Sequence, residues 1–140
     1  MGEHLKECRI IEVPHFTDHR GTLAVIEGVP FLSFDPKRFY YIYDIAGDAR
    51  RGCHAQRSGQ KLILALAGSF KILVDDGESR SEFQLDRPDQ GLYVPPMVWH
   101  ELHSFALGSV CGVLASDTYN ADGCYNSYED FLADFQKSKL

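Results

Sequence analysis

Nine short segments rich in β-branched and aromatic residues constrain the fold of this chain more than any other feature. Gly, Pro and Asp separate them, and short apolar runs bounded by such residues are typical of strands. The expected strands span residues 9–13, 22–27, 39–44, 61–67, 70–74, 81–85, 91–94, 99–105 and 110–116. Nine strands within 140 residues predict one all-β domain over residues 1–140, built as a barrel or a sandwich.

Alternation along two of these segments predicts that each strand has an inner and an outer face. In the segment KLILALAG the leucines at 62, 64 and 66 share one face. In RFYYIYD, Tyr41 and Tyr43 share a face and Tyr40 lies on the opposite one. Aromatic residues on strands are more often core residues than a ligand platform. Tyr41 is kept as a candidate for the site.

Two local signals lie outside this pattern. Asp76-Gly77 separates two strand segments, and such a pair supplies the positive φ angles of a tight hairpin. Near the end of the chain, Tyr128, Phe131, Leu132 and Phe135 follow helical spacing, and Ser127 with Asp130 resembles a capping box. We therefore expect a short C-terminal helix whose apolar stripe packs on the strands.

The charge and the cysteines limit the class of function. The formal charge of −6 without a basic run argues against nucleic acid and anionic membranes as partners. A phosphate-bearing ligand stays open, because a few arginines inside one pocket can bind it. The four cysteines are widely spaced and are expected to be free thiols. No apolar stretch of signal-peptide length occurs near the N-terminus, so a cytoplasmic location is expected.

Two motifs carry the candidate chemistry. His54-Ala55-Gln56 is followed by Gln60, and later by Pro96 and His100. The pattern resembles the two cupin motifs, in which an HxH pair, an acidic residue and a later histidine converge inside a jelly-roll β-barrel. Positions 54 and 56 share a strand face. Neutral amides at 56 and 60 are poor ligands for a transition metal, so no metal is expected.

A closer resemblance covers nearly the whole chain. The blocks DHRGTLAVIEG, KRFYYIYD, RRGCHAQ, LAGSFKILVDDG, GLYVPPMVWHELHSF and VLASDTY are similar to those of the dTDP-sugar 3,4-ketoisomerases. These cupins act on dTDP-4-keto-6-deoxyglucose. The resemblance implies an enzyme without a metal or other cofactor that forms dimers with exchanged N-terminal strands. It also implies a product that aminotransferases convert to amino sugars for polysaccharides or antibiotics.

The chemistry of this family needs a base and an acid, because the proton on C3 must leave and C4 must receive one. Histidine suits both roles, since its ordinary pKa is near neutrality. In the family both histidines of HxH are the proposed proton carriers. They correspond to His54 and to Gln56. The amide of Gln56 can donate a hydrogen bond to an enediolate oxygen, but it cannot exchange protons near neutral pH. Three interpretations stay open: isomerisation with His54 as the sole base, helped by Tyr41, His100 or water; a related proton transfer; or a nucleotide-sugar-binding pocket that is weak or inactive.

Five residues are candidates for substrate binding. Arg20 and Arg51 match the geometry of a diphosphate, with surface ion pairs as the alternative. His100 either orients a sugar hydroxyl or forms a hydrogen bond within the core. The resemblance gives Gln60 the role of holding the substrate or His54. Trp99 either stacks on the nucleotide or packs in the core, whereas His103 is expected to face away from the pocket.

Overall fold

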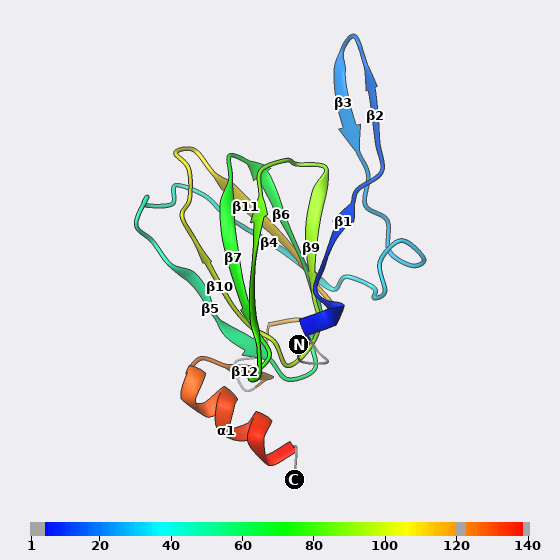
Figure 1. Cartoon of the computed structure of the whole chain (residues 1–140). Helices are drawn as coiled ribbons and strands as arrows, with labels where there is room; N and C mark the ends of the chain where they lie inside the picture. Colours follow the sequence, from blue (N-terminus) through cyan, green and yellow to red (C-terminus); the bar gives the residue numbers. More distant parts are fainter. Residues whose placement is uncertain (1–4, 120–122, 139–140) are drawn as a thin grey trace.

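The computed structural model describes residues 5–119 and 123–138, in which two five-stranded antiparallel sheets face each other (Figure 1). The first sheet has the order β1-β9-β6-β11-β4, formed by Arg9–Glu12, Gln90–Val94, Lys61–Ala67, Val110–Ala115 and Arg38–Ile42. The second has the order β12-β5-β10-β7-β8, formed by Cys124–Tyr125, Arg51–Gln56, Trp99–His103, Phe70–Asp75 and Arg80–Leu85. Most neighbouring strands in the sheets are distant in sequence, as in a jelly roll. The predicted cupin-type jelly roll is confirmed, although the two sheets do not close into one cylinder.

Three further elements complete the chain. A hairpin of β2 (His15–Asp18) and β3 (Gly21–Ala24) projects away from both sheets (Figure 1). A 3-10 helix, η1, spans Leu5–Glu7, and the helix α1 spans Tyr128–Ser138 at the opposite end of the molecule from the hairpin. No helix in the described part of the chain is long and apolar enough to cross a membrane.

Both faces of the central strand β6 are buried. Ile63 and Ala65 face the core between the two sheets, with Phe70, Ile72 and Val113 in the same cluster. The opposite face of β6 is covered by the chain that precedes β4, which contributes Leu32 and Phe34. Burial on both sides explains why this segment reads as an almost continuous apolar run.

All nine predicted strands are present, with small differences at their ends. The sequence pattern missed β2, β5 and β12 as separate strands. The hairpin strand β2 is exposed along its whole length, and β12 has two residues. The segment RGCHAQ of β5 combines polar residues with glycine, so it lacks the apolar alternation by which strands are recognised.

The predicted turn and helix are both confirmed. The β7–β8 hairpin turns at Gly77 with a φ of 96°, and the buried carboxylate of Asp76 accepts hydrogen bonds from the backbone of Glu78 and Ser79. The hydroxyl of Ser127 accepts a hydrogen bond from the backbone of Asp130 at the start of α1. The apolar stripe of α1 covers β5 and β12, with Phe131 fully buried.

The buried ring of Phe131 provides a test of helix docking. It packs beside Trp99 and Tyr125 with 0% exposure. We expect Phe131→Ala to lower the free energy of unfolding by about 3–5 kcal/mol, because truncation leaves a cavity. Urea denaturation measures the change, with Leu107→Ala as the control. Leu107 is fully exposed, so its truncation should cost less than about 0.5 kcal/mol. Equal effects of the two substitutions would contradict the packing of α1.

Candidate active site

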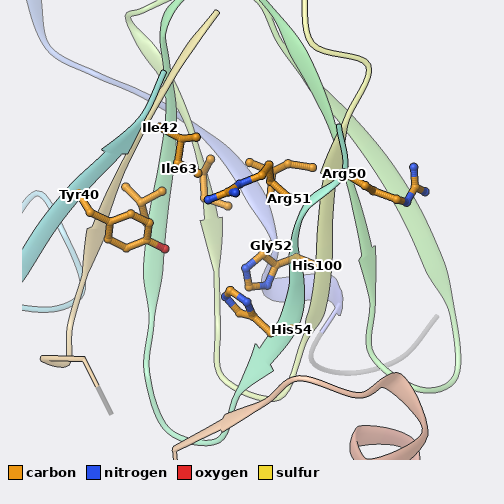
Figure 2. A pocket seen from close by; sticks show the side chains of 10 residues that line it. Tyr40, Ile42, Arg50, Arg51, Gly52, His54, Ile63 and His100 are labelled. Atoms are coloured by element: carbon orange, nitrogen blue, oxygen red, sulfur yellow. The ribbon is translucent and has the colours of Figure 1, made fainter. Parts of the chain in front are cut away.

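A cavity of about 270 Å³ lies between the two sheets. Its walls come from strands of both sheets, and its lining residues are Tyr40, Ile42, Arg50, Arg51, Gly52, His54, Ile63, His100, Leu102 and Val113. Figure 2 shows the imidazoles of His54 and His100 next to one another and the side chain of Arg51 extending above them. We refer to this cavity as the inter-sheet pocket.

A β-bulge in β5 brings the polar residues of the inter-sheet pocket together. His54 pairs with His100 of β10, but Gly52 pairs with Glu101, so Cys53 is an extra residue. Gly52 and Cys53 have positive φ angles of 78° and 49°. A Cβ at Gly52 would lie 3.2 Å from the carbonyl oxygen of His100, and this close approach together with the positive φ favours glycine there. The extra residue shifts the alternation and allows Arg51 and His54 to face the same pocket.

His54 and His100 form the polar centre of the pocket. Their ring centroids are 4.8 Å apart with the planes nearly perpendicular, and His100 is 2% exposed. Nδ1 of His100 lies 3.5 Å from the carbonyl oxygen of Val98. The prediction that positions 54 and 100 line one pocket is confirmed.

A lysine that the sequence interpretation missed contacts this pair. Nζ of Lys61, the first residue of β6, lies 2.9 Å from Nε2 of His54 and 5.8 Å from the centre of the Tyr40 ring. Lys61 is 2% exposed and shares a strand face with Ile63, which lines the pocket. An ammonium can only donate, so at this distance Nε2 is the acceptor and His54 is neutral when Lys61 is charged.

Burial lowers the pKa of all three groups, which leaves the two imidazoles neutral and Lys61 charged at neutral pH. Desolvation, followed by the charge of Lys61, lowers the pKa of His54 to about 4. The same two causes hold the pKa of His100 well below its usual value. Burial also lowers the pKa of Lys61 to about 8. His54 is therefore a neutral imidazole at physiological pH, which is the state in which it can accept a proton.

The two arginines of the pocket have different surroundings. Nε of Arg50 lies 2.7 Å from a carboxylate oxygen of Glu101, and Figure 2 shows its side chain pointing away from the histidines. None of the ion pairs found within residues 5–119 and 123–138 involves Arg51. Arg51 is exposed at the edge of the pocket, where its guanidinium is available to an anionic ligand.

The structure places Tyr41 and Trp99 outside the inter-sheet pocket, and Trp99 takes the packing alternative. Tyr41 lies on the outer face of β4 and is 58% exposed, whereas Tyr40 lines the inter-sheet pocket. Trp99 lies on the side of β10 that faces α1, 4% exposed, where its Nε1 donates to Glu101. Alternation placed Tyr40 opposite Tyr41, but it could not tell which of these faces was the inner one.

The two glutamines lie outside the pocket lining. Gln60 does not hold His54, because its side-chain oxygen accepts hydrogen bonds from Tyr93 and Ser33 on the outer side of the first sheet. Its neighbour Lys61 makes the contact with His54 instead. The amide of Gln56 points toward Gly59, so its part in catalysis stays a prediction.

Arg20 and His103 lie away from the inter-sheet pocket. Arg20 occupies the turn of the projecting hairpin and forms an ion pair with Asp18, with 79% of its side chain exposed. A role in substrate binding thus requires another arrangement of the hairpin. His103 faces away as predicted and pairs with Glu82. In the part of the chain that is described, no three His, Cys, Asp or Glu side chains converge as a metal site would require.

Sequence reasoning did not select Tyr40, which lines the pocket, or Lys61, which contacts His54 from behind the lining. Alternation placed Tyr40 opposite Tyr41 and Tyr43, and only the exposure of those two rings in the structure shows that Tyr40 faces inward. The signal for Lys61 was a charged residue at the start of an apolar run that is buried on both faces. The site thus combines two neutral imidazoles and a phenol with an ammonium that contacts His54.

Comparisons with known proteins find one family profile and several sugar 3,4-ketoisomerases that are similar to this chain. The profile of one family, FdtA (WxcM-like, C-terminal), matches residues 6–136. The TDP-4-oxo-6-deoxy-alpha-D-glucose-3,4-oxoisomerase of Aneurinibacillus thermoaerophilus is 40% identical over 134 residues, 96% of each chain. QdtA, a sugar 3,4-ketoisomerase from Thermoanaerobacterium thermosaccharolyticum solved with TDP, has a TM-score of 0.92 at 32% identity, covering 97% of this chain and 99% of that one. The TDP-quinovose 3,4-ketoisomerase WlaRB from Campylobacter jejuni has a TM-score of 0.87 at 35% identity, with coverages of 91% and 98%.

The low pKa of His54 predicts a pH-dependent stability. Unfolded, His54 takes up a proton near pH 6.5, whereas in the folded chain it does so only near pH 4. Between these values the unfolded state binds the extra proton, so stability falls as the pH falls. We expect the free energy of unfolding of His54→Asn to depend on pH less steeply over this window, by at most ~1.4 kcal/mol per pH unit. Urea denaturation from pH 7 to pH 4 measures both slopes, and equal slopes would contradict a neutral, buried His54.

Proposed function

The chain belongs to the FdtA family, and from this premise we propose that it is a 3,4-ketoisomerase acting on a TDP-linked 4-keto-6-deoxyhexose. The observation that carries the proposal is a neutral histidine in a cavity between the sheets of a fold shared with sugar 3,4-ketoisomerases. The protein is an intramolecular oxidoreductase of deoxysugar biosynthesis, because a ketone and a neighbouring hydroxyl exchange positions within one molecule.

His54 is the base of the proposed reaction. Removal of the proton from C3 leaves an enediolate spread over C3 and C4, and return of a proton to C4 completes the shift of the ketone. A base near neutral pH must be uncharged, which burial and the adjacent Lys61 ensure for His54. His100, with its ring beside that of His54, is placed to contact a sugar hydroxyl.

Arg51 is the proposed contact of the diphosphate. It lies at the edge of the same pocket as His54, and a guanidinium matches phosphate oxygens in pairs.

The proposed location is the cytoplasm. Two observations support it: the four cysteines are free thiols, and the proposed substrate is a nucleotide sugar. Aminotransferases can convert the 3-keto group of the product to an amino group. We therefore propose that the enzyme acts one step before an aminotransferase that makes an amino sugar for a polysaccharide.

We also propose a homodimer in which the β2–β3 hairpin packs on a second copy. Phe16 and Leu23 are cross-strand neighbours on this hairpin and are 66% and 64% exposed. The outer face of β4 and the residue after it present a second apolar surface, with Phe39, Tyr41 and Tyr43 between 52% and 62% exposed. Burial of both surfaces against each other would remove this apolar area from water. The same arrangement would carry Arg20 away from its own chain and toward the partner's substrate.

The proposed activity predicts solvent exchange at the reacting carbons. Incubation of the protein with TDP-4-keto-6-deoxyglucose in D₂O should place deuterium at C3 or C4 of the sugar, as measured by NMR. We expect His54→Asn to slow isomerisation by about 10²–10⁴-fold, because a positioned base contributes this much. Arg9→Gln, which alters an exposed residue of β1 outside the pocket, serves as the control. Tight binding of TDP without any exchange would favour a binding protein instead.

The proposed dimer depends on the hairpin. Replacing both Phe16 and Leu23 with Glu should convert the dimer to a monomer, because buried carboxylates without partners are unfavourable. Size-exclusion chromatography with light scattering measures the mass of the wild type and the variant. Leu107→Glu, a change at a fully exposed loop residue, is the matched control. A variant hairpin that leaves a dimer intact would rule out this interface.

A further inference from the structure

Lys61 is a buried cation without a counter-charge. It is 2% exposed, and no Asp or Glu within residues 5–119 and 123–138 forms an ion pair with it. A buried ammonium normally needs an anionic partner, because loss of hydration is unfavourable. Its partner here is the neutral Nε2 of His54 at 2.9 Å. Such an arrangement has a cost in stability and fits a site that receives negative charge from a ligand.

The groups around Lys61 carry no negative charge at neutral pH. Six titratable groups from five strands interact electrostatically with Lys61, His54 or His100. They are Arg38, Tyr40, His54, His100, Cys111 and Cys124. Burial raises the pKa of Tyr40 and of Cys111 to about 12, and it also raises that of Cys124. Nε of Arg38 is itself buried without a hydrogen-bond partner in the described structure. Within residues 5–119 and 123–138, the groups that act on Lys61 are therefore cationic or neutral.

The contact between Lys61 and His54 limits how His54 can act. The lone pair of Nε2 accepts the hydrogen bond from Lys61, and the carbonyl of Gly52 is the backbone hydrogen-bond partner of the ring. His54 can remove a proton through Nε2 only when Lys61 releases that lone pair. The released ammonium must then find another acceptor inside the protein. A sugar oxygen that becomes negative at the same moment meets this requirement.

We propose that Lys61 is a catalytic residue: as Nε2 of His54 takes the proton from C3, the Lys61 ammonium donates its hydrogen bond to the C4 oxygen of the sugar. This assignment rests on the proposed ketoisomerase function. The C3–H bond breaks and an N–H bond forms on His54, while the electron pair moves into a C3–C4 double bond and places the charge on the C4 oxygen. A preorganised donor at a developing oxyanion stabilises the transition state more than the ground state.

The remaining steps return every proton. The hydroxyl proton of O3 moves to O4, the proton on His54 is delivered to C4, and the C3 carbonyl forms. Lys61 then returns to Nε2 of His54, so neither group changes its charge over the cycle. The ammonium also explains how the site works with an amide at position 56: it supplies the second ionisable group beside His54 that Gln56 cannot supply.

Lys61→Met tests the assignment, because methionine keeps the unbranched stem and removes the charge and the donor. We expect kcat to fall by about 10²–10³-fold with little change in KM, which is the usual effect of removing one oxyanion donor. Ethylamine added to Lys61→Ala should restore part of kcat by occupying the vacated space. Lys37→Met, a change at an exposed lysine, is the matched control and should leave kcat unchanged. Thermal unfolding of Lys61→Met should occur at or above the wild-type temperature, since an unpaired buried charge is removed.

The pH dependence separates this role from a structural one. The wild-type kcat should fall above about pH 8, where Lys61 loses its proton, and this alkaline decline should be absent from Lys61→Met. NMR titration of the unliganded protein should show a higher pKa for His54 in Lys61→Met, because a neighbouring positive charge has gone. An active wild type whose kcat and alkaline decline survive in a folded Lys61→Met would overturn the assignment. A wild type without isomerase activity would overturn the proposed function, and the NMR titration would still test the Lys61–His54 contact.

Discussion

The pairing of β5 with β10 is the constraint on which the site depends. His54 pairs with His100 and Gly52 pairs with Glu101. The residue between them in β5, Cys53, has no partner in β10 and forms the bulge. Without this bulge Arg51 and His54 would face opposite sides of the sheet. The bulge favours glycine at position 52, because φ is positive there and a Cβ would approach the carbonyl of His100 closely. One irregularity in the ladder thus places a phosphate-binding candidate and a base around the same cavity.

The electrostatics of the pocket follow from its position between two sheets. Removal from water favours the neutral form of every base in it, and the effect is strongest for His100, which is almost inaccessible. The same desolvation strengthens any interaction with a charge that develops during a reaction. A cation at the base of such a pocket lowers the pKa of the neighbouring imidazole and attracts an enediolate. The cost in stability and the gain in reactivity therefore have one physical origin.

Sequence reasoning succeeded where local chemistry decides structure. The Asp76-Gly77 turn, the capped amphipathic helix and the strand β6 were predictable, because each depends on neighbours in the chain. It could not decide which face turns inward, as with Tyr40 and Tyr41, or which alternative held for Trp99. For position 60 the prediction was one residue away from the contact. Lys61, and not Gln60, contacts His54, and the two side chains point to opposite sides of the first sheet.

The sequence by itself determined the fold class, the family and the presence of a histidine at position 54 with an amide at position 56. Motif order and strand periodicity are properties of the chain, so both can be recognised from the sequence alone. Only the tertiary structure decided which residues meet in the pocket. The contact of Lys61 with His54 joins strands of two different sheets, and the alignment of Arg51 with His54 depends on a bulge. Both result from the packing of one sheet against the other, and periodicity within a single strand carries no information about such packing.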